Sequence, residues 1–499
     1  MELRDSNLVD LGGAVQLPKY DRAGLTAGIV HIGVGSFHRA HQAMIIDDLL
    51  NQGLARDWAI CGVGLMPSDA AMRDALATQD GLYTLVLKHP DGRLEARVVG
   101  SIIDYLYAPD DVEAVIERMA NPEVRVVSLT VTEGGYNIHP VTGEFDMSNA
   151  DVRADLASGA VPATMFGITV EALRRRRDRR IAPFTVMSCD NLQENGLVAR
   201  RTFVAFATAK DAELGRWIDA NVSFPSSMVD RITPVTTDDD RAQIAKTFGI
   251  ADRWPVVCEP FIQWALEDSF SDGRPPYEHS QTQLVSDVAP YELMKLRLLN
   301  ASHQGLCYFA HLMGYRLVHD AAADPLIADF LRAYMNDEAT PTLQPVPGVD
   351  LDGYKDELIE RFSNPGVRDT VARLCNESSD RIPKWLLPVV REQLAVDGNI
   401  EMSAAIVASW ARYAEGVDEQ GEPIKVADRI RDRVMANAAE YPRDRHSFLR
   451  DRNIFGDLID DARFVAAYDR ALDLLHRVGA RRTLAVLLGR EAEPDAAGP

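Results

Sequence analysis

A strand, a glycine turn and a helix follow one another near the start of the chain, and this unit constrains the fold more than any other feature. Residues 28–33, Gly-Ile-Val-His-Ile-Gly, form an apolar run that ends in glycine, and residues 39–51 place apolar side chains at helical spacing. A second apolar run follows at 58–63. Strand, helix and strand in this order begin a parallel sheet, so the sequence predicts an α/β domain.

The rest of the chain divides into a part rich in strands and a part dominated by helices. Further strand-like runs are 124–131, 184–188 and 255–258, and the runs 83–88 and 94–99 flank Pro-Asp-Gly as in a hairpin. After residue 285 helical periodicity dominates, most clearly over 291–315 and 404–416, with a proline-rich break at 341–347. Single cores stop growing near about 250–300 residues. For 499 residues we therefore predict an α/β domain over 1–285, a mostly helical domain over 286–489 and a disordered tail over 490–499.

Composition excludes several classes of protein. The net charge of -22 argues against a nucleic-acid partner and disfavours anionic membranes. The basic run 174–177 ends an apparent helix, where cations suit the helix dipole. The N-terminus lacks an apolar signal segment, and no run of 18 apolar residues is present. The cysteines are scattered and form no CxxC pair, which indicates reduced thiols and a cytoplasmic protein; they are Cys61, Cys189, Cys258, Cys307 and Cys375.

A candidate nucleotide site follows the first strand. Gly33 and Gly35 would let the backbone approach a pyrophosphate at the start of the next helix, as in Rossmann-type domains. Phe37 lies within the same turn, and Arg39 adds a cation that could meet phosphate. The fingerprint is imperfect, because His38 stands where the third glycine is expected.

A single acid marks the end of the second strand. Asp69 could accept hydrogen bonds from the adenosine ribose and repel a 2′-phosphate, which favours NAD over NADP. The same residue could instead cap the helix that starts at Ala70, and the two roles do not exclude each other.

No metal site is predicted. His38 and His41 lack a third ligand nearby, and His303, His311 and His319 recur every eight residues, a spacing that turns about 80° per step on a helix. These histidines would not converge on one ion.

The stretch 291–303 carries the most informative polar residues. Glu292, Lys295, Asn300 and His303 fall within an arc of about 140° on an α-helix whose apolar residues lie all round it. A helix that is apolar all round is buried, and a buried lysine needs a partner or a function. The alternative is a lysine whose amine extends to water, with the asparagine and histidine as satisfied core residues.

Alcohol oxidation is the chemistry that would use these side chains. As hydride leaves the carbon, a base must take the hydroxyl proton, and burial can lower the pKa of lysine from about 10.4 towards the working pH. Amides can hold the developing alkoxide. Asn300 is one such group, and Asn191, which follows the strand 184–188, lies where parallel sheets bind their ligands.

Five segments together resemble the mannitol 2-dehydrogenases of the polyol-specific long-chain dehydrogenase family. They are GVGSFHRAH at 33–41, SLTVTEGGY at 128–136, FTVMSCDNLQENG at 184–196, FPSSMVDRITP at 224–234 and MKLRLLNASH at 294–303. The resemblance covers residues 28 to 480 and implies a Rossmann-type domain, a helical domain and hydride transfer to NAD without zinc.

The resemblance also implies roles for individual residues. Lys295 would be the base, Asn191 and Asn300 would polarise the reacting oxygen, and His303 would contact the substrate. Asp230 and Arg373 would bind further hydroxyl groups. The expected reaction is the oxidation of D-mannitol to D-fructose and its reverse, with a polyol or ketose as the small-molecule partner and a monomeric enzyme.

The sequence departs from the pattern of this family at two places, and other functions remain as alternatives. Asn-Glu-Ser-Ser-Asp at 376–380 replaces the turn expected after Arg373, and Ser68 leaves only one carboxylate at the ribose position. A hexuronate reductase of the fructuronate type would share the lysine and the asparagines, and a D-arabinitol 4-dehydrogenase is a further alternative. A non-catalytic nucleotide-binding protein is the alternative from a different class.

Overall fold

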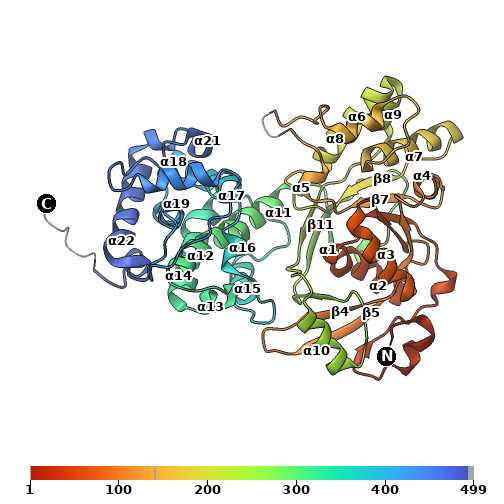
Figure 1. Cartoon of the computed structure of the whole chain (residues 1–499), viewed down its shortest axis with the longest axis horizontal. Helices are drawn as coiled ribbons and strands as arrows, with labels where there is room; N and C mark the ends of the chain where they lie inside the picture. The colour runs from red at the N-terminus through yellow and green to blue at the C-terminus, as the bar shows by residue number, and fades with distance from the viewer. Residues whose placement is uncertain (1, 140–141, 493–499) are drawn as a thin grey trace. The chain divides into compact units, whose positions relative to one another are not determined.

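The computed structural model describes residues 2–139 and 142–492, and the chain divides into two compact units, Met1–Ala289 and Pro290–Pro499 (Figure 1). In the part of the chain that the structure describes, the first unit is α/β with three sheets, and the second is almost entirely helical. The fold class expected from the sequence is thus confirmed. From residue 493 on, the predicted tail lies outside the described residues.

A five-stranded parallel sheet forms the centre of the first unit, with the strand order β6-β3-β2-β7-β8. Its strands are β2 Ile29–Ile32, β3 Ile60–Gly64, β6 Ile102–Tyr107, β7 Val126–Leu129 and β8 Thr185–Ser188. The order reverses direction between β2 and β7, and open α/β sheets bind ligands beyond the carboxyl ends of strands at such a point. The strand β6 was not expected from the sequence, because its polar side chains suit an edge strand rather than a buried one.

The two faces of this sheet are covered differently. Val30 and Ile32 of β2 point into a core shared with the helices α4 Val112–Ala120, α7 Met165–Arg179 and α8 Asn195–Lys210. Ile29 points to the opposite face, where the core is shared with α2 Gln42–Asn51 and strands of the other sheets. The remaining helices of this unit are α1 Ser36–Ala40, α3 Ala70–Thr78, α5 Thr132–Gly135, α6 Ala150–Leu156, α9 Ala212–Asn221 and α10 Asp238–Phe248.

Two smaller sheets complete the first unit. The predicted hairpin is present as β4 Tyr83–Lys88 and β5 Leu94–Val99, in a sheet of order β1-β5-β4-β10 with β1 Val15–Gln16 and β10 Val256–Cys258. The third sheet has the order β12-β11-β9 and consists of β9 Ser227–Asp230, β11 Gln263–Glu267 and β12 Thr282–Val285. Asp230 is the last residue of β9 and pairs with Gln263.

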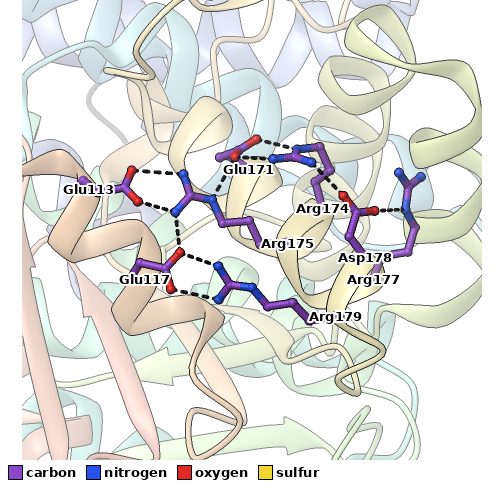
Figure 2. Close-up of polar contacts among 8 residues, drawn as sticks. All are labelled: Glu113, Glu117, Glu171, Arg174, Arg175, Arg177, Asp178 and Arg179. Carbon is purple, nitrogen blue, oxygen red and sulfur yellow. Dashed lines mark hydrogen bonds and ion pairs between the residues drawn. The ribbon is translucent and has the colours of Figure 1, made fainter.

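The basic run 174–177 lies at the end of α7; Arg174, Arg175 and Arg177 pair with acidic residues of α4 and of α7 itself (Figure 2), while the buried Arg176 donates to backbone carbonyl oxygens. Arg175 binds Glu113 and Glu117 of α4, at 2.5 Å each, and Glu171 of its own helix at 2.9 Å. Exposed ion pairs contribute about 0.2–1 kcal/mol each, so the network adds modestly to the apolar packing of the two helices. This pairing accounts for the basic run without a nucleic-acid partner.

The second unit contains α12 Ala301–Leu312 (Figure 1), a helix whose residues are nearly all buried. A Cβ on Gly305 would lie 3.1 Å from both Ile406 and Leu331, so this glycine sets how closely α19 and α14 approach α12. The other α-helices are α11 Ala289–Met294, α13 Val318–Ala322, α14 Pro325–Ala333, α15 Leu351–Phe362, α16 Val371–Leu374, α17 Ser378–Trp385, α18 Leu387–Ala395, α19 Glu401–Ala414, α20 Arg431–Ala439, α21 Arg452–Phe455 and α22 Ala462–Leu487, and a π-helical turn, Tyr334–Ala339, follows α14. None of the helices in the described residues has the length and apolar character needed to cross a lipid bilayer.

Candidate active site

The glycine turn after β2 lies against the end of β7, at the point where the strand order reverses. Gly33 has a φ of +90°, and a Cβ built on it would lie 2.2 Å from the carbonyl oxygen of Thr130. Only glycine fits there without displacing the backbone. A Cβ on Gly35 would meet only the carbonyl oxygen of Gly33, at 3.8 Å. The turn thus offers bare backbone at the edge of the sheet, which is the surface that a pyrophosphate requires.

The missing third glycine is replaced by a pair of stacked histidines. The third glycine of this fingerprint normally permits close packing of helix on strand. Here the ring of His38 stacks on the ring of His31 from β2, with centroids 3.3 Å apart. Burial lowers the pKa of both rings, so both histidines are neutral. Neither ring nitrogen of His38 has a hydrogen-bond partner within the described part of the chain.

The side chain of Arg39 is used inside the domain. It is fully buried, and its guanidinium donates to the carbonyl oxygens of Trp254 and Gly35 and lies over the ring of Tyr83. Burial lowers the pKa of Arg39 to about 10. The contact with phosphate that the sequence suggested gains no support from this geometry.

The helix predicted over 39–51 is broken at His41. This residue has φ and ψ of -121° and -96°, and it separates the short helix α1 from α2. Its ring stacks on Phe37 at 4.9 Å and meets the edge of Trp264 at 5.1 Å. Sequence periodicity did not predict this break.

Asp69 stabilises the turn after β3 rather than the helix that follows it. Its Oδ2 accepts hydrogen bonds from the backbone N–H groups of Leu65 and Met66, at 2.9 Å each. Its side chain makes no capping hydrogen bond to α3, so the prediction that Asp69 caps the helix starting at Ala70 is wrong. No hydrogen bond from the described residues reaches Oδ1, and this half-buried carboxylate keeps one oxygen for a ligand.

Asn191 follows β8 in a loop that buried polar residues hold in place. Its neighbour Asp190 accepts hydrogen bonds from the N–H groups of Val131 and Thr132, at 3.1 and 2.7 Å, and from the hydroxyl of Tyr136 at 2.8 Å. Burial raises the pKa of Asp190, although these bonds favour its charged form. The loop of Asn191 is therefore tied to the loop after β7.

A buried asparagine links the same loop to the strand of Asp230. Asn195 donates to the carbonyl oxygens of Asp190 and Ser227, at 2.9 and 2.7 Å, and accepts from the N–H of Ser227 at 2.9 Å. Ser227 begins β9, and the buried Asp230 ends it. Asn191 and Asp230 are thus positioned by one hydrogen-bonded framework within the first unit.

In the second unit, Lys295 and Asn300 are the first and last residues of a π-helical turn between α11 and α12. The N–H of Ala301 donates to the carbonyl oxygen of Leu296, five residues back. In an α-helix, two residues that are five positions apart point in directions that differ by about 140° around the axis. In a π turn, the hydrogen bonds join residues five positions apart, so such residues lie closer to one side of the helix. The structure therefore brings Lys295 and Asn300 closer to one side than the α-helix assumed from the sequence.

Lys295 and Asn300 are both buried, and the side-chain amide of Asn300 keeps a hydrogen-bond donor without an acceptor among the described residues. Lys295 is 8% exposed and Asn300 is 6% exposed. Among the described residues, no hydrogen-bond acceptor reaches Nδ2 of Asn300. A buried amide donor without a partner costs about 1–3 kcal/mol, a cost that an incoming oxygen would remove.

His303 and Arg373 are associated with a common aspartate. Arg373, within the short helix α16, forms a two-pronged ion pair with Asp369, and its Nε lies 2.6 Å from Oδ1. Burial alone would raise the pKa of Asp369, but the bonds and charge of Arg373 and the charge of His303 lower it overall. The ring of His303 also packs on Phe362, with centroids 4.3 Å apart.

Sequence reasoning did not single out Asp190, Asn195 and Asp369. A signal existed for two of them. Asp190 directly follows a buried strand, and Asp369 stands four residues before Arg373, the spacing of helical ion pairs. Across residues 2–139 and 142–492, no group of three or more His, Cys, Asp and Glu side chains could hold a metal ion.

Family models match both units of the chain. Residues 27–279 match the mannitol dehydrogenase Rossmann domain, and residues 287–476 match the mannitol dehydrogenase C-terminal domain. The chain is 46% identical to a mannitol 2-dehydrogenase of Phaeosphaeria nodorum, over 97% of this chain and 85% of the relative. A mannitol dehydrogenase of Saccharomyces cerevisiae is 45% identical, over 96% of this chain and 95% of the relative.

Two solved structures share this fold over nearly their whole length. The Pseudomonas fluorescens mannitol 2-dehydrogenase in ternary complex with NAD and D-mannitol has a TM-score of 0.86 and 45% identity, covering 98% of this chain and 100% of that one. A D-sorbitol dehydrogenase in substrate-free form has a TM-score of 0.90 and 39% identity, covering 97% of this chain and 100% of that one.

Proposed function

Because the chain belongs to the mannitol dehydrogenase family, with both family domains present, we propose that it oxidises D-mannitol to D-fructose with NAD and catalyses the reverse reduction. The observation that carries this proposal is the buried π turn, in which the amine of Lys295 lies five residues from Asn300, whose Nδ2 has no acceptor among the described residues. Similarity to a structure in complex with NAD and D-mannitol supports the choice of cofactor and substrate.

Each side chain of the candidate site has a defined part in this reaction. Lys295 takes the proton of the reacting hydroxyl as the carbon loses hydride, and NAD, when bound, accepts that hydride. Asn191 and Asn300 donate hydrogen bonds to the same oxygen and stabilise its negative charge. The reverse reaction returns the proton from Lys295 to the ketose oxygen.

The remaining residues bind the rest of the polyol. His303 positions the reacting end, and Asp230 and Arg373 bind further hydroxyl groups. The ion pair with Asp369 supports this role of Arg373, because it fixes the guanidinium plane while leaving N–H groups for a hydroxyl.

NAD is held in the first unit. Gly33 and Gly35 supply the bare backbone for the pyrophosphate, with Phe37 and His38 beside it and Arg39 holding α1 to the domain. Asp69 binds the adenosine ribose through Oδ1 while Oδ2 fixes the turn. We further propose a monomer in the cytoplasm, which light scattering and cell fractionation can test.

The test is an absorbance assay at the NADH band with D-mannitol, D-arabinitol, D-sorbitol, D-fructose and D-fructuronate. We expect the highest kcat/KM for the mannitol–fructose pair. Asn300→Ala should lower kcat by about 10²–10³-fold while NADH affinity is unchanged. Preference for fructuronate would identify a hexuronate reductase, and NADH binding without turnover on any substrate would identify a non-catalytic protein.

A further inference from the structure

The π turn over 295–300 needs contacts from outside the helix. A π turn is rare, and this one lies between two ordinary α-helices. Its sequence, Lys-Leu-Arg-Leu-Leu-Asn, contains no glycine or proline and consists mainly of good α-helix formers. Local preference therefore favours an α-helix, and the surrounding structure must hold the less favourable form.

The side chain of Arg297, in the middle of the turn, supplies one such contact. It is 7% exposed, and it forms a two-pronged ion pair with Glu392 of α18, at 2.7 and 2.6 Å. Its Nη1 also donates to the carbonyl oxygen of Thr342, at 2.7 Å. Two-pronged arginine–carboxylate pairs fix direction as well as distance, so the turn is anchored to two other segments of the unit.

The main chain of Arg297 supplies the second contact. In an α-helix its carbonyl oxygen would accept the N–H of Ala301, four residues on. Here that oxygen accepts the hydroxyl of Tyr334, at 3.0 Å, while the N–H of Ala301 goes to Leu296. A side chain that inserts into the hydrogen-bond ladder in this way favours the π turn over the α-helix.

We infer that Arg297 is a positioning residue for the alcohol oxidation proposed above, on which this inference rests. Together with Tyr334 it keeps residues 295–300 in the π form, and this form places Lys295 and Asn300 near one side of the helix. If the turn became α-helical, the two side chains would separate by up to about 140° around the axis. The base and the oxygen donor would then no longer meet the same hydroxyl.

Two variants and a matched control test this inference. In Arg297→Gln, kcat should fall by about 10- to 100-fold, because small misplacements of catalytic groups are this costly. The apparent pKa of the base in the pH profile of kcat/KM should also shift. Tyr334→Phe keeps the ring and removes the hydroxyl, so it should produce the same changes to a smaller degree. NADH affinity should stay within about twofold of wild type in both variants, since both residues lie in the second unit, outside the proposed NAD site.

Arg391→Gln is the control, because Arg391 is also on α18 and binds an aspartate, Asp457, and the carbonyl oxygen of Phe455, away from the π turn. It should keep the wild-type kcat and pH profile. If Arg297→Gln does not fold, Tyr334→Phe decides alone. Wild-type kcat and an unchanged pH profile in Tyr334→Phe, or equal losses in Arg391→Gln, would overturn the inference.

Failure of the proposed function would be seen separately, as a wild-type protein that oxidises no polyol. The inference about the turn could then still be tested by crystal structures of the two variants. An α-helical segment over 295–300 in Tyr334→Phe would support it, and an unchanged π turn in both variants would refute it.

Discussion

Replacing Gly33 with alanine tests whether the contact between β2 and β7 forms the nucleotide site. Alanine at a φ of +90° costs about 1–2 kcal/mol in backbone strain. The new Cβ would lie 2.2 Å from the carbonyl oxygen of Thr130, and Cβ contacts under 3.0 Å are essentially never seen, so the strand end must retreat by about 0.8 Å.

That retreat would weaken two hydrogen bonds of Thr130. Its N–H donates to Ile32 at 3.0 Å, and its hydroxyl donates to Gly33 at 2.6 Å. A typical hydrogen bond contributes about 1 kcal/mol, so the total destabilisation should be about 3–4 kcal/mol. The same movement distorts the edge on which the pyrophosphate would lie, and NADH affinity should fall by at least about tenfold, or 1.4 kcal/mol.

Gly53→Ala is the matched control. Gly53 has a similar φ of +77°, but nothing lies within 4 Å of the Cβ that alanine would add. Gly53→Ala should therefore lose only the stability that backbone strain costs, about 1–2 kcal/mol, and its NADH affinity should be unchanged. Urea unfolding followed by circular dichroism gives the stabilities, and NADH fluorescence titration gives the affinities. If the two variants lose equal stability and both bind NADH like wild type, the reasoning about the strand contact is wrong.

Further predictions concern the base, the cofactor, a buried acid and metals. Lys295→Met should lower kcat by at least about 10²–10⁴-fold while NADH still binds. Lys355→Met removes another buried lysine of the same unit and should leave kcat unchanged. Equal losses of kcat in the two variants would contradict the assignment of Lys295 as the base. Asp69→Ala should shift the ratio of kcat/KM with NAD to kcat/KM with NADP by at least about tenfold towards NADP. If kcat/KM changes by the same factor with both cofactors, Asp69 does not bind the adenosine ribose. Burial raises the pKa of Glu338 from its ordinary value of 4.5 to about 7 in the folded protein. The protonated side chain therefore stabilises the folded state fully below pH 4.5. This stabilisation is lost as the pH rises through 7. Relative to Glu338→Gln, wild type should therefore lose about 3 kcal/mol of stability between pH 4.5 and pH 8, and a constant difference in urea unfolding would contradict this. Dialysis against a strong chelator should leave activity intact; activity that is lost and then restored by zinc would show a metal requirement.

The buried strands were predictable because their sequences carry the signal of their environment. The runs around β2, β3, β7 and β8 are almost wholly apolar, as strands covered on both faces must be. The edge strand β6 carries Asp104 and half-buried tyrosines, so its sequence resembles a loop or a surface strand, and only pairing with β3 defines it.

The residues of the candidate site remain predictions from the sequence, and the backbone geometry around Lys295 and Asn300 could not be predicted from it. Lys295 and Asn300 attract attention as polar groups in an apolar helix, but the π turn depends on Glu392 and Tyr334, which lie far away in sequence. Arg39 illustrates the same limit. A cation beside a glycine turn suggests phosphate, while the carbonyl oxygen of Trp254 that binds it cannot be identified from the local sequence.

The π turn also shifts the phase of the helix that contains it. Beyond residue 300, every side chain is rotated by about 100° from the direction that an unbroken α-helix starting at Ala289 would give it. Deleting one residue within 295–300 would allow a regular α-helix, and because one α-helical residue also corresponds to about 100°, the side chains of α11 and of the buried α12 would keep their present directions. Such a deletion should therefore remove the π turn, and with it the relation between Lys295 and Asn300, while the packing of α12 is largely kept.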